Sequence, residues 1–329
     1  MKKEIIALLQ ESDDYVSGEE MSQTLGISRA AIWKHIHALK EEGYEILSVS
    51  KKGYRLMQLG DRLSENELSP YMPSSGIGAA LQYYESVDST SSIAKKLADE
   101  GAKEGLVVIS EEQTGGRGRM GRNWISPKYK GIWMSIILKP LMEPQFVAKI
   151  TQVAAAAVVL AAKDIGFDVG VKWPNDLVLN GKKVCGILTE MSGEMNQINY
   201  IVIGVGINAN LDTKDFDDST KKTATSFKIE GKQKINRQKL AGRIFHHMNM
   251  LYEQFLNDGL GARSIQVCRE HSVLIGKKVV VMRGSDQYEG QVLSINDQGE
   301  LVVKRDNGEI EALFSGEVSI RGEKGYVPT

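Results

Sequence analysis

The sequence predicts a protein that combines helices and strands in three consecutive parts. Residues 1–62 contain short amphipathic helices followed by two strand-like segments. Residues 63–275 alternate apolar strands with helices, and residues 276–329 contain only short strands punctuated by glycines, as in a small barrel. We therefore expect a small N-terminal domain, a larger central domain and a small C-terminal β-domain.

The composition indicates a folded protein with a sizeable core. The chain has 329 residues, of which 42% are hydrophobic and 25% are charged, and its net charge is -1. Any binding to nucleic acid must therefore come from a local basic face. The cysteines at 185 and 268 lack a metal-ligand spacing, so we expect a reduced, cytoplasmic protein. No uninterrupted apolar run reaches the length of a membrane span, and the N-terminus is not typical of a signal peptide.

The first part of the chain predicts two helices joined by a tight turn. A helix over residues 3–11 precedes Ser17, which is a plausible cap because Glu20 follows three residues later. Gly26 ends this second helix, and Ser28 can cap the next one. A short helix, a glycine turn and another helix form a helix-turn-helix pattern.

The helix after Ser28 has an apolar side and a basic side. Strands expected at 44–49 and 53–56 follow it, with two lysines at the tip between them, which is typical of a winged helix. Exposed basic and polar groups on such a helix and wing meet DNA phosphates and bases. The residues that we expect to contact DNA are Ser28, Arg29, Ala30, Trp33, Lys34, His37, Lys51 and Lys52. A small helical docking module is the alternative interpretation.

The stretch from 113 to 124 is the most distinctive in the central part. Four glycines and three arginines fall within residues 115–122, directly after an apolar strand over 106–110. Such a loop can approach an anion closely and surround it with forked donors. Its G-x-G-x-x-G match does not indicate a dinucleotide fold, because residues 123–127 do not begin a helix. A flexible basic surface loop is the alternative.

Other polar groups of the central part accompany this loop. A run of small hydroxyl residues at 88–92 precedes a helix expected over 93–101, and the turn at 172–176 follows a strand. Asn180-Gly181 predicts a hairpin, and a further strand ends at Asn208. With no apparent Ser-His-Asp or Cys-His arrangement, the set suggests charge stabilisation rather than covalent catalysis. Asp176 is a candidate for placing Mg²⁺, although the turn could simply end a strand.

Several of these stretches, in this order, resemble the bifunctional biotin–protein ligases that also repress biotin synthesis genes. The resemblance covers nearly the whole chain. It implies an α+β protein with a winged helix-turn-helix, a central mixed-sheet ligase domain like those of class II synthetases, and an SH3-like barrel. It rests on residues 28–36, 88–90, 116–122, 172–176, 183–188 and 204–208.

The resemblance also implies an activity. The enzyme joins biotin and ATP into biotinyl-5′-AMP with Mg²⁺, releases pyrophosphate, and transfers biotin to a lysine of a carrier domain of acetyl-CoA carboxylase or a related carboxylase. It implies that the protein binds operator DNA as a homodimer and that a bound ligand promotes formation of this dimer. Implied biotin contacts are Ser89, Thr90, Ser91, Gln113, Arg117, Gly118, Arg119 and Lys183; implied adenylate contacts are Trp124, Asn175 and Asn208; and implied catalytic groups are Arg119, Lys183 and Asp176, the last also for the metal.

Two other functions stay open from the sequence. A lipoate or octanoate ligase shares the catalytic fold, and a repressor that only senses its ligand shares the DNA-binding part. The presence of Asn175, Asp176 and Lys183 together argues against a repressor without catalysis. Met120 stands where some relatives carry arginine, so the loop has one charge fewer and its grip on the intermediate can differ.

Overall fold

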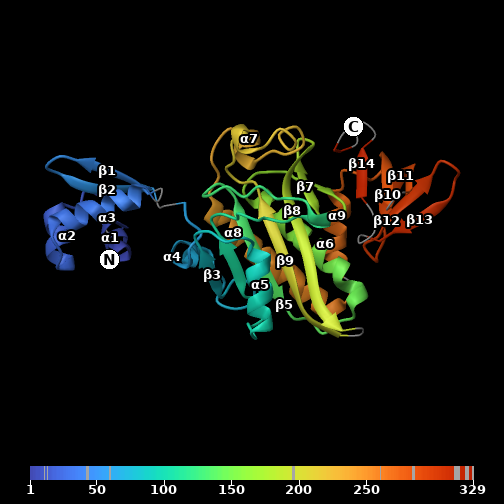
Figure 1. Cartoon of the computed structure of the whole chain (residues 1–329), viewed down its shortest axis with the longest axis horizontal. Helices are drawn as coiled ribbons and strands as arrows, with labels where there is room; N and C mark the ends of the chain where they lie inside the picture. The colour runs from blue at the N-terminus through green and yellow to red at the C-terminus, as the bar shows by residue number, and fades with distance from the viewer. Residues whose placement is uncertain are drawn as a thin grey trace. The chain divides into compact units, whose positions relative to one another are not determined.

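A computed structural model describes residues 1–329 with the exception of 11, 13, 42–43, 59–60, 195–196, 260, 284–285, 315–318, 323–325 and 328–329. The chain forms two compact units, Met1–Glu67 and Leu68–Thr329 (Figure 1). The larger unit contains both the predicted central domain and the predicted C-terminal β-domain.

The N-terminal unit is a winged helix-turn-helix, as predicted. Ser17 accepts a hydrogen bond from the Glu20 backbone N–H at 3.0 Å, and Gly26 ends the helix in the left-handed conformation with φ 65°. Ser28 Oγ accepts from the backbone N–H of Ala31 at 3.2 Å. The elements are α1 (Lys2–Gln10), α2 (Gly18–Leu25), α3 (Arg29–Glu41) and the antiparallel strands β1 (Glu45–Val49) and β2 (Gly53–Gln58).

The core of this unit lies between the three helices and the hairpin. Ile32, Ile36 and Leu39 of α3 are buried among apolar residues of α1, α2 and β1. Because these three side chains share one side of α3, the polar side of the helix is left for solvent. The predicted apolar and basic sides are therefore both present.

The larger unit is organised around a seven-stranded mixed sheet. The strand order is β3-β4-β5-β9-β8-β7-β6, and only the β3–β4 pair among these is parallel. Asn180 and Gly181 both have positive φ, 49° and 77°, as the predicted hairpin turn requires. The strands are β3 (Leu81–Tyr84), β4 (Val107–Ser110), β5 (Ile132–Leu138), β6 (Gly170–Lys172), β7 (Asp176–Leu179), β8 (Lys182–Glu194) and β9 (Gln197–Ile207).

Helices cover both faces of this sheet. α5 (Thr90–Asp99) packs on β4, β5 and β9, whereas α6 (Val147–Asp164) packs on β6 to β9. Thr189 of β8 hydrogen-bonds Thr151 of α6 at 2.8 Å, and its neighbour Leu188 lines the cavity described below. Because successive strand residues point to opposite faces, α6 and the cavity lie on opposite faces of the sheet.

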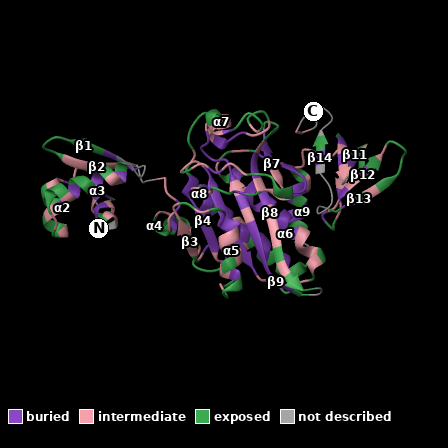
Figure 2. Ribbon diagram, viewed as in Figure 1, coloured by how far each residue is buried: buried purple, intermediate pink, exposed green. Residues whose placement is uncertain are grey.

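Helix α6 is the most deeply buried helix of the unit. The segment Pro144–Asp164 is long and apolar enough to span a membrane by length and composition, but 72% of its most apolar window is buried inside the fold. The sheet covers it on one side and α8 (Arg237–Asp258) and α9 (Ala262–Glu270) pack against it (Figure 2). It is therefore a core helix.

The C-terminal part is a five-stranded antiparallel sheet of order β13-β12-β11-β10-β14, in keeping with the predicted small β-domain. Its Gly299 carbonyl contacts the central domain, because it accepts from Trp173 Nε1 at 3.0 Å and from Gln152 Nε2 of α6 at 2.5 Å. Its strands are β10 (Lys278–Arg283), β11 (Asp286–Ile295), β12 (Leu301–Arg305), β13 (Ile310–Leu313) and β14 (Ser319–Gly322), of which the last was not predicted.

Some predicted boundaries are wrong by a few residues. The helix expected from 93 begins at Thr90, because Ser89 caps it by accepting from the Ser92 N–H at 3.5 Å. The strand-like sequence at residues 83–87, which we also expected to be a strand, is extended only as far as Tyr84, and Val87 makes an isolated bridge with Gln113. The sequence did not predict α4 (Glu65–Leu68), α7 (Phe227–Gly231) or α9.

Candidate functional site

The face of the sheet that carries α5 holds a cavity of about 940 Å³. It extends from the N-terminus of α5 across β8 and β9 to the C-terminal sheet. Every residue that the sequence predicted for biotin, adenylate or metal lines this one cavity: Ser89, Thr90, Ser91, Gln113, Arg117, Gly118, Arg119, Trp124, Asn175, Asp176, Lys183 and Asn208. The structure therefore brings the predicted site residues together, and the role of each remains a prediction.

At the α5 end, neutral side chains form a continuous hydrogen-bond chain. Gln113 Oε1 accepts from the Thr90 N–H at 2.9 Å and from Thr90 Oγ1 at 3.0 Å. Ser135 Oγ lies 2.8 Å from Thr90 Oγ1 and 3.0 Å from Ser91 Oγ. Since each hydroxyl has one proton, Ser91 donates to Ser135, Ser135 to Thr90, and Thr90 to Gln113.

The amide nitrogen of Gln113 also has a hydrogen-bond partner. Gln113 Nε2 donates to Ser126 Oγ at 3.0 Å, and Ser126 Oγ lies 3.2 Å from the carbonyl of Trp124. Thr90, Ser126 and Ser135 are buried, so these groups are withdrawn from competing water. The end of the cavity at α5 is thus rigid, polar and uncharged, which suits a neutral ring with hydrogen-bonding edges.

Three strand glycines shape the floor of the cavity. A Cβ at Gly206 would lie 2.5 Å from Trp124 Nε1, and a Cβ at Gly204 would lie 2.8 Å from Ser91 Oγ. A Cβ at Gly186 would lie 2.8 Å from the Trp124 ring. The glycines of β8 and β9 therefore allow the indole and the start of α5 to approach the sheet closely.

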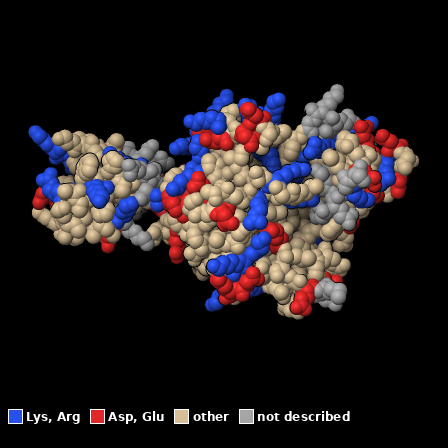
Figure 3. Space-filling view, in the orientation of Figure 1, with Lys and Arg blue, Asp and Glu red and all other residues tan. Residues whose placement is uncertain are grey.

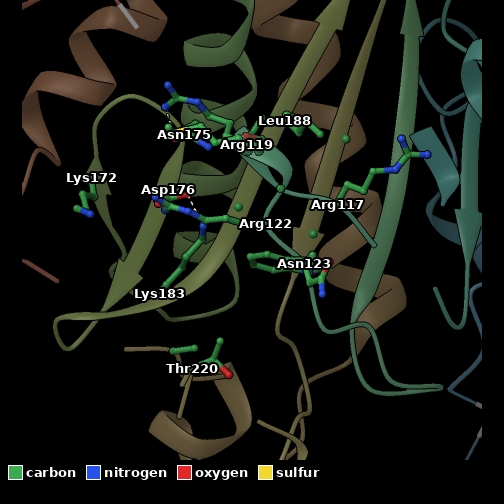
Figure 4. A pocket seen from close by; sticks show the side chains of 18 of the residues that line it. Arg117, Arg119, Arg122, Asn123, Lys172, Asn175, Asp176, Lys183, Leu188 and Thr220 are labelled. Atoms are coloured by element: carbon green, nitrogen blue, oxygen red, sulfur yellow. Dashed lines mark hydrogen bonds and ion pairs between the residues drawn. The ribbon is translucent and has the colours of Figure 1, made fainter. Parts of the chain in front are cut away.

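The opposite end of the cavity is charged. Lys183 Nζ lies 2.6 Å from Asp176 Oδ1, and the Tyr326 hydroxyl donates to Asp176 Oδ2. Arg119 donates to Asn175 Oδ1 at 3.1 Å, and Asn175 Nδ2 donates to the Ile187 carbonyl at 2.8 Å. Figure 4 shows Arg119 directed at Asn175 and Lys183 directed at Asp176, so the turn between β6 and β7 receives one cationic side chain from the glycine-arginine loop and one from β8.

Positive charge is in excess over the cavity as a whole. Among the described lining residues Asp176 is the only carboxylate, whereas the cations are Arg117, Arg119, Arg122, Lys172, Lys183 and Arg321. Burial lowers the pKa of Lys172 to about 8; Asp176 opposes this shift, and Lys183, Arg321 and Arg122 add to it. Burial also lowers the pKa of Arg119 from its ordinary value, again against the attraction of Asp176. A polyanionic ligand would relieve this repulsion.

The glycine-arginine loop forms a small hairpin whose arginines diverge. Gly118 N–H donates to the Arg122 carbonyl at 2.7 Å, and Arg117 forms a bridge with Asn123. Arg117 donates to Ser92 Oγ of α5 and points away from the Arg119 side chain (Figure 4). Met120 adopts φ 57° and is 77% exposed at the tip. Thus Arg119, and not Arg117, reaches the charged end of the cavity.

Asn208 holds a second loop against the site. Its Nδ2 donates to the Thr225 carbonyl at 3.0 Å, and the backbone of Lys183 pairs with Thr223 O and Thr225 N, each at 2.8 Å. The loop before α7 thereby places Thr220 opposite Lys183 across the cavity (Figure 4). We infer that Asn208 acts chiefly by fixing this loop.

Sequence reasoning missed lining residues from two regions. The loop at 212–226 contributes Phe216, Thr220 and Thr223, and the C-terminal part contributes Val280, Met282, Ile320, Arg321 and Tyr326. These residues belong to no local motif, and long-range folding alone brings them to the cavity. The strand glycines did carry a signal, because glycine inside a strand indicates a close approach.

No group of three or more His, Cys, Asp or Glu residues that could hold a metal ion occurs within the described part of the chain. The donor set of the cavity still fits one type of metal binding. Mg²⁺ is commonly held by one or two carboxylates together with substrate phosphates, and Asp176 lies among phosphate-compatible cations. Asp176 is thus suited to a metal that arrives with a nucleotide.

The N-terminal unit presents a separate candidate surface. All eight residues predicted to contact DNA are exposed, including Trp33, which is 60% exposed and lies 5.6 Å from the ring of His37. Most charged side chains on the visible face of this unit in Figure 3 are Lys or Arg, whereas both signs are interspersed on the larger unit. The geometry thus provides a basic helix face and a basic wing tip on one small unit.

Three family models match the chain. The HTH domain matches residues 2–55, the biotin/lipoate A/B protein ligase family matches residues 83–208, and the biotin protein ligase C-terminal domain matches residues 274–321. Together these matches cover all three parts predicted from the sequence.

Curated relatives match over almost their full length. The bifunctional ligase/repressor BirA of Bacillus subtilis (strain 168) is 37% identical over 325 residues, which are 97% of this chain and 98% of that protein. The protein of the same name from Escherichia coli (strain K12) is 30% identical over 96% of each chain. A solved biotin protein ligase from Aquifex aeolicus in complex with biotin and ATP is similar in fold, with a TM-score of 0.63 and 24% identity over 74% of this chain and 98% of that chain.

Proposed function

The chain belongs to the family of bifunctional ligase/repressors, and from this premise we propose how its residues divide the work. It is an ATP-dependent biotin–protein ligase and a biotin-responsive transcriptional repressor. In this proposal residues 63–275 are the catalytic domain, residues 1–62 bind operator DNA, and residues 276–329 complete the nucleotide end of the cavity. The observation that carries the ligase part is a single cavity with a neutral, pre-paired end and a cationic end.

The neutral end holds the biotin ring. The ordered chain from Ser91 to Gln113 has fixed donor and acceptor directions, and a ureido ring offers both kinds of partner at its edge. Ser89 lies at the cap of the same helix, beside this chain. The indole of Trp124, lying over Gly206, provides an apolar wall for the middle of the ligand.

The cationic end assists the attack of the biotin carboxylate on the α-phosphorus of ATP. A carboxylate oxygen forms the new bond to phosphorus, the bond to the β-phosphate oxygen breaks, and pyrophosphate leaves with that electron pair. This step brings two anions together, and Lys183 and Arg119 offset their repulsion from opposite sides of the Asn175–Asp176 turn.

Asp176 would hold Mg²⁺ together with phosphate oxygens. Bound there, Mg²⁺ would neutralise charge on the phosphates. The Lys183 ammonium, now 2.6 Å from the carboxylate, would then be released towards the α-phosphate. Asn208 keeps the loop at 212–226 against the adenylate, and Arg117 and Gly118 close the biotin side.

In the second half-reaction a lysine amine of a carrier domain attacks the acyl carbon of biotinyl-5′-AMP. An amide bond forms, AMP leaves, and the amine gives up a proton. We propose the biotin carboxyl carrier domain of acetyl-CoA carboxylase or a related carboxylase as the acceptor. Intact mass spectrometry of such a domain after incubation with the protein, ATP and biotin should show one added biotinyl group.

The control uses lipoate in place of biotin, because the matching family model includes lipoate ligases. Lipoyl transfer with no biotinyl transfer would favour the lipoate or octanoate alternative. No acyl transfer and no acyl-adenylate, from a protein that still binds biotin, would favour a repressor that only senses its ligand.

We propose that the protein acts in the cytoplasm and represses transcription as a homodimer. Binding of the ligand promotes formation of this homodimer. One winged helix makes few phosphate contacts, and two copies on a roughly palindromic operator combine theirs. Bound adenylate would order the loop at 115–122 and so remove an entropic cost of dimerisation. Adding biotin and ATP should tighten operator binding, and removing residues 1–62 should abolish it while adenylation continues. Operator affinity that does not respond to biotin and ATP at any protein concentration would contradict this regulatory proposal.

A further inference from the structure

A tyrosine close to the C-terminus occupies the charged end of the cavity. The Tyr326 hydroxyl donates to Asp176 Oδ2, and the Lys172 ammonium lies 3.6 Å from the centre of the Tyr326 ring. Lys183 Nζ lies 2.6 Å from the other oxygen of the same carboxylate. In the ligand-free chain, both Asp176 oxygens and the Lys172 ammonium therefore have partners from the chain itself.

The chemistry of a phenol explains why it fits there. Its ring face attracts a desolvated cation, and its hydroxyl donates to a carboxylate. Burial and the neighbouring Asp176 raise the pKa of Tyr326 far above its ordinary value, so the phenol stays neutral. A neutral group, however, leaves the positive charges of Arg122, Lys172 and Arg321 around it unbalanced. A triphosphate would balance them, so the phenol is the weaker of two possible occupants.

We propose that Tyr326 sets the affinity for ATP by competing with the triphosphate for Lys172 and Asp176. This inference rests on the proposed function, because it assigns the charged end of the cavity to the nucleotide. Tyr326 must leave its two partners before phosphate oxygens and a phosphate-bound metal reach them. The apparent dissociation constant of ATP equals the intrinsic constant divided by the fraction of molecules in which the tyrosine has left. The residue thus raises the KM for ATP and leaves kcat and biotin binding unchanged.

The test compares Tyr326→Ala and Tyr326→Phe with wild type in the full-length chain. Calorimetry measures binding of adenosine 5′-(α,β-methylene)triphosphate, whose α–β bridge cannot be cleaved, with Mg²⁺ and again with EDTA. Tyr326→Ala removes the ring and the hydroxyl, and we expect about three- to tenfold tighter binding in both conditions. Tyr326→Phe keeps the ring on Lys172, so its gain should be smaller. Val327→Ala, a change of the next residue, which does not line the cavity, serves as the matched control and should bind like wild type.

Biotin affinity reports folding of each variant independently, since the biotin end of the cavity contains no C-terminal residue among those described. Should Tyr326→Ala lose biotin binding, the Phe variant decides alone, because it preserves the ring. Unchanged or weaker nucleotide binding in a variant that binds biotin normally would overturn the competition. A wild-type protein that never forms an acyl-adenylate would overturn the proposed function instead, so the two failures are distinguishable.

Discussion

The two ends of the cavity differ in how their polar groups are held before a ligand binds. At the biotin end, Gln113, Thr90 and Ser135 already hydrogen-bond one another with distances of 2.8 to 3.0 Å. At the end that we propose for the nucleotide, Lys183 and Tyr326 are both bonded to the Asp176 carboxylate, and in our proposal the substrate separates these groups. We therefore propose that the first end binds its ligand without rearrangement and that the second end exchanges its contacts when the ligand binds.

The difference follows from the charges of the ligands. Neutral hydroxyls and amides can be ordered in advance and still offer further donors and acceptors to a ring. Buried cations without an anion repel one another, and Asp176 partly offsets this repulsion in the ligand-free chain. We therefore expect substitutions at the biotin end to change biotin affinity, and substitutions at the nucleotide end to change rate or ATP affinity.

The largest effect should come from Lys183→Ala. In the proposed mechanism this ammonium lies at the reacting phosphate and acts mainly in the transition state, so adenylation should slow about 10²- to 10³-fold while biotin affinity changes little. Biotin-dependent pyrophosphate exchange and calorimetry with biotin measure the two quantities. Lys182→Ala, in an exposed residue next to it, is the control and should behave like wild type. If biotin affinity fell by as large a factor as the rate, the proposed separation of a biotin end from a nucleotide end would be contradicted.

Thr90→Val tests the biotin end. It leaves Ser135 without its acceptor and Gln113 Oε1 with one donor fewer, a cost of about 1–3 kcal/mol that corresponds to about 5- to 150-fold in biotin affinity. Thr90→Ser keeps the hydroxyl and should retain most of the affinity. Nucleotide-analogue binding should be unaffected in both variants, and a matching loss there would show that the ends are not independent.

The pH dependence of nucleotide binding tests Lys172. Burial lowers its pKa to about 8, so the ammonium is present below that pH and is lost above it. Binding of an ATP analogue should therefore weaken as pH rises from 7 to 9, by at most about tenfold. Lys172→Arg keeps its charge throughout and should flatten the profile. The same slope in wild type and in the arginine variant would assign the titration to another group.

Arg117→Ala should have the smallest effect. Its side chain bonds to Ser92 of α5 and not to the charged turn, so we expect a few-fold faster release of the acyl-adenylate with little change in its formation. Arg119→Ala should release the acyl-adenylate faster than Arg117→Ala does, because Arg119 bonds to Asn175 at the charged end of the cavity. Rapid-quench measurement of retained biotinyl-5′-AMP compares the two variants. An equal effect would contradict the different roles that we assign to the two arginines.

The sequence predicted the lining residues that belong to short motifs better than those that long-range folding brings to the cavity. Ser89 to Ser91, the loop around Arg119 and the turn at Asp176 each belong to a short motif, and all of them line the cavity. The direction of the arginines could not be predicted, because it depends on which neighbour, Ser92 or Asn175, lies within reach after folding.

The C-terminal contribution could not be predicted at all. Tyr326 lies 150 residues from Asp176 in the chain and belongs to no motif. Its position depends on how β14 pairs with β10, and β14 is a short strand with little pattern of its own. Similarly, α9 was missed although it packs on α6, because its apolar side consists of few residues.

Biotin-dependent exchange of labelled pyrophosphate into ATP tests the central claim most directly, because it requires both ends of the cavity at once. We expect exchange that needs biotin and is not supported by lipoate. It should fall to near background in Lys183→Ala but persist in Thr90→Val when biotin is raised to saturation. Exchange that proceeds without biotin, or none at all from a folded protein that binds both biotin and ATP, would contradict the assignment of this cavity to biotin adenylation.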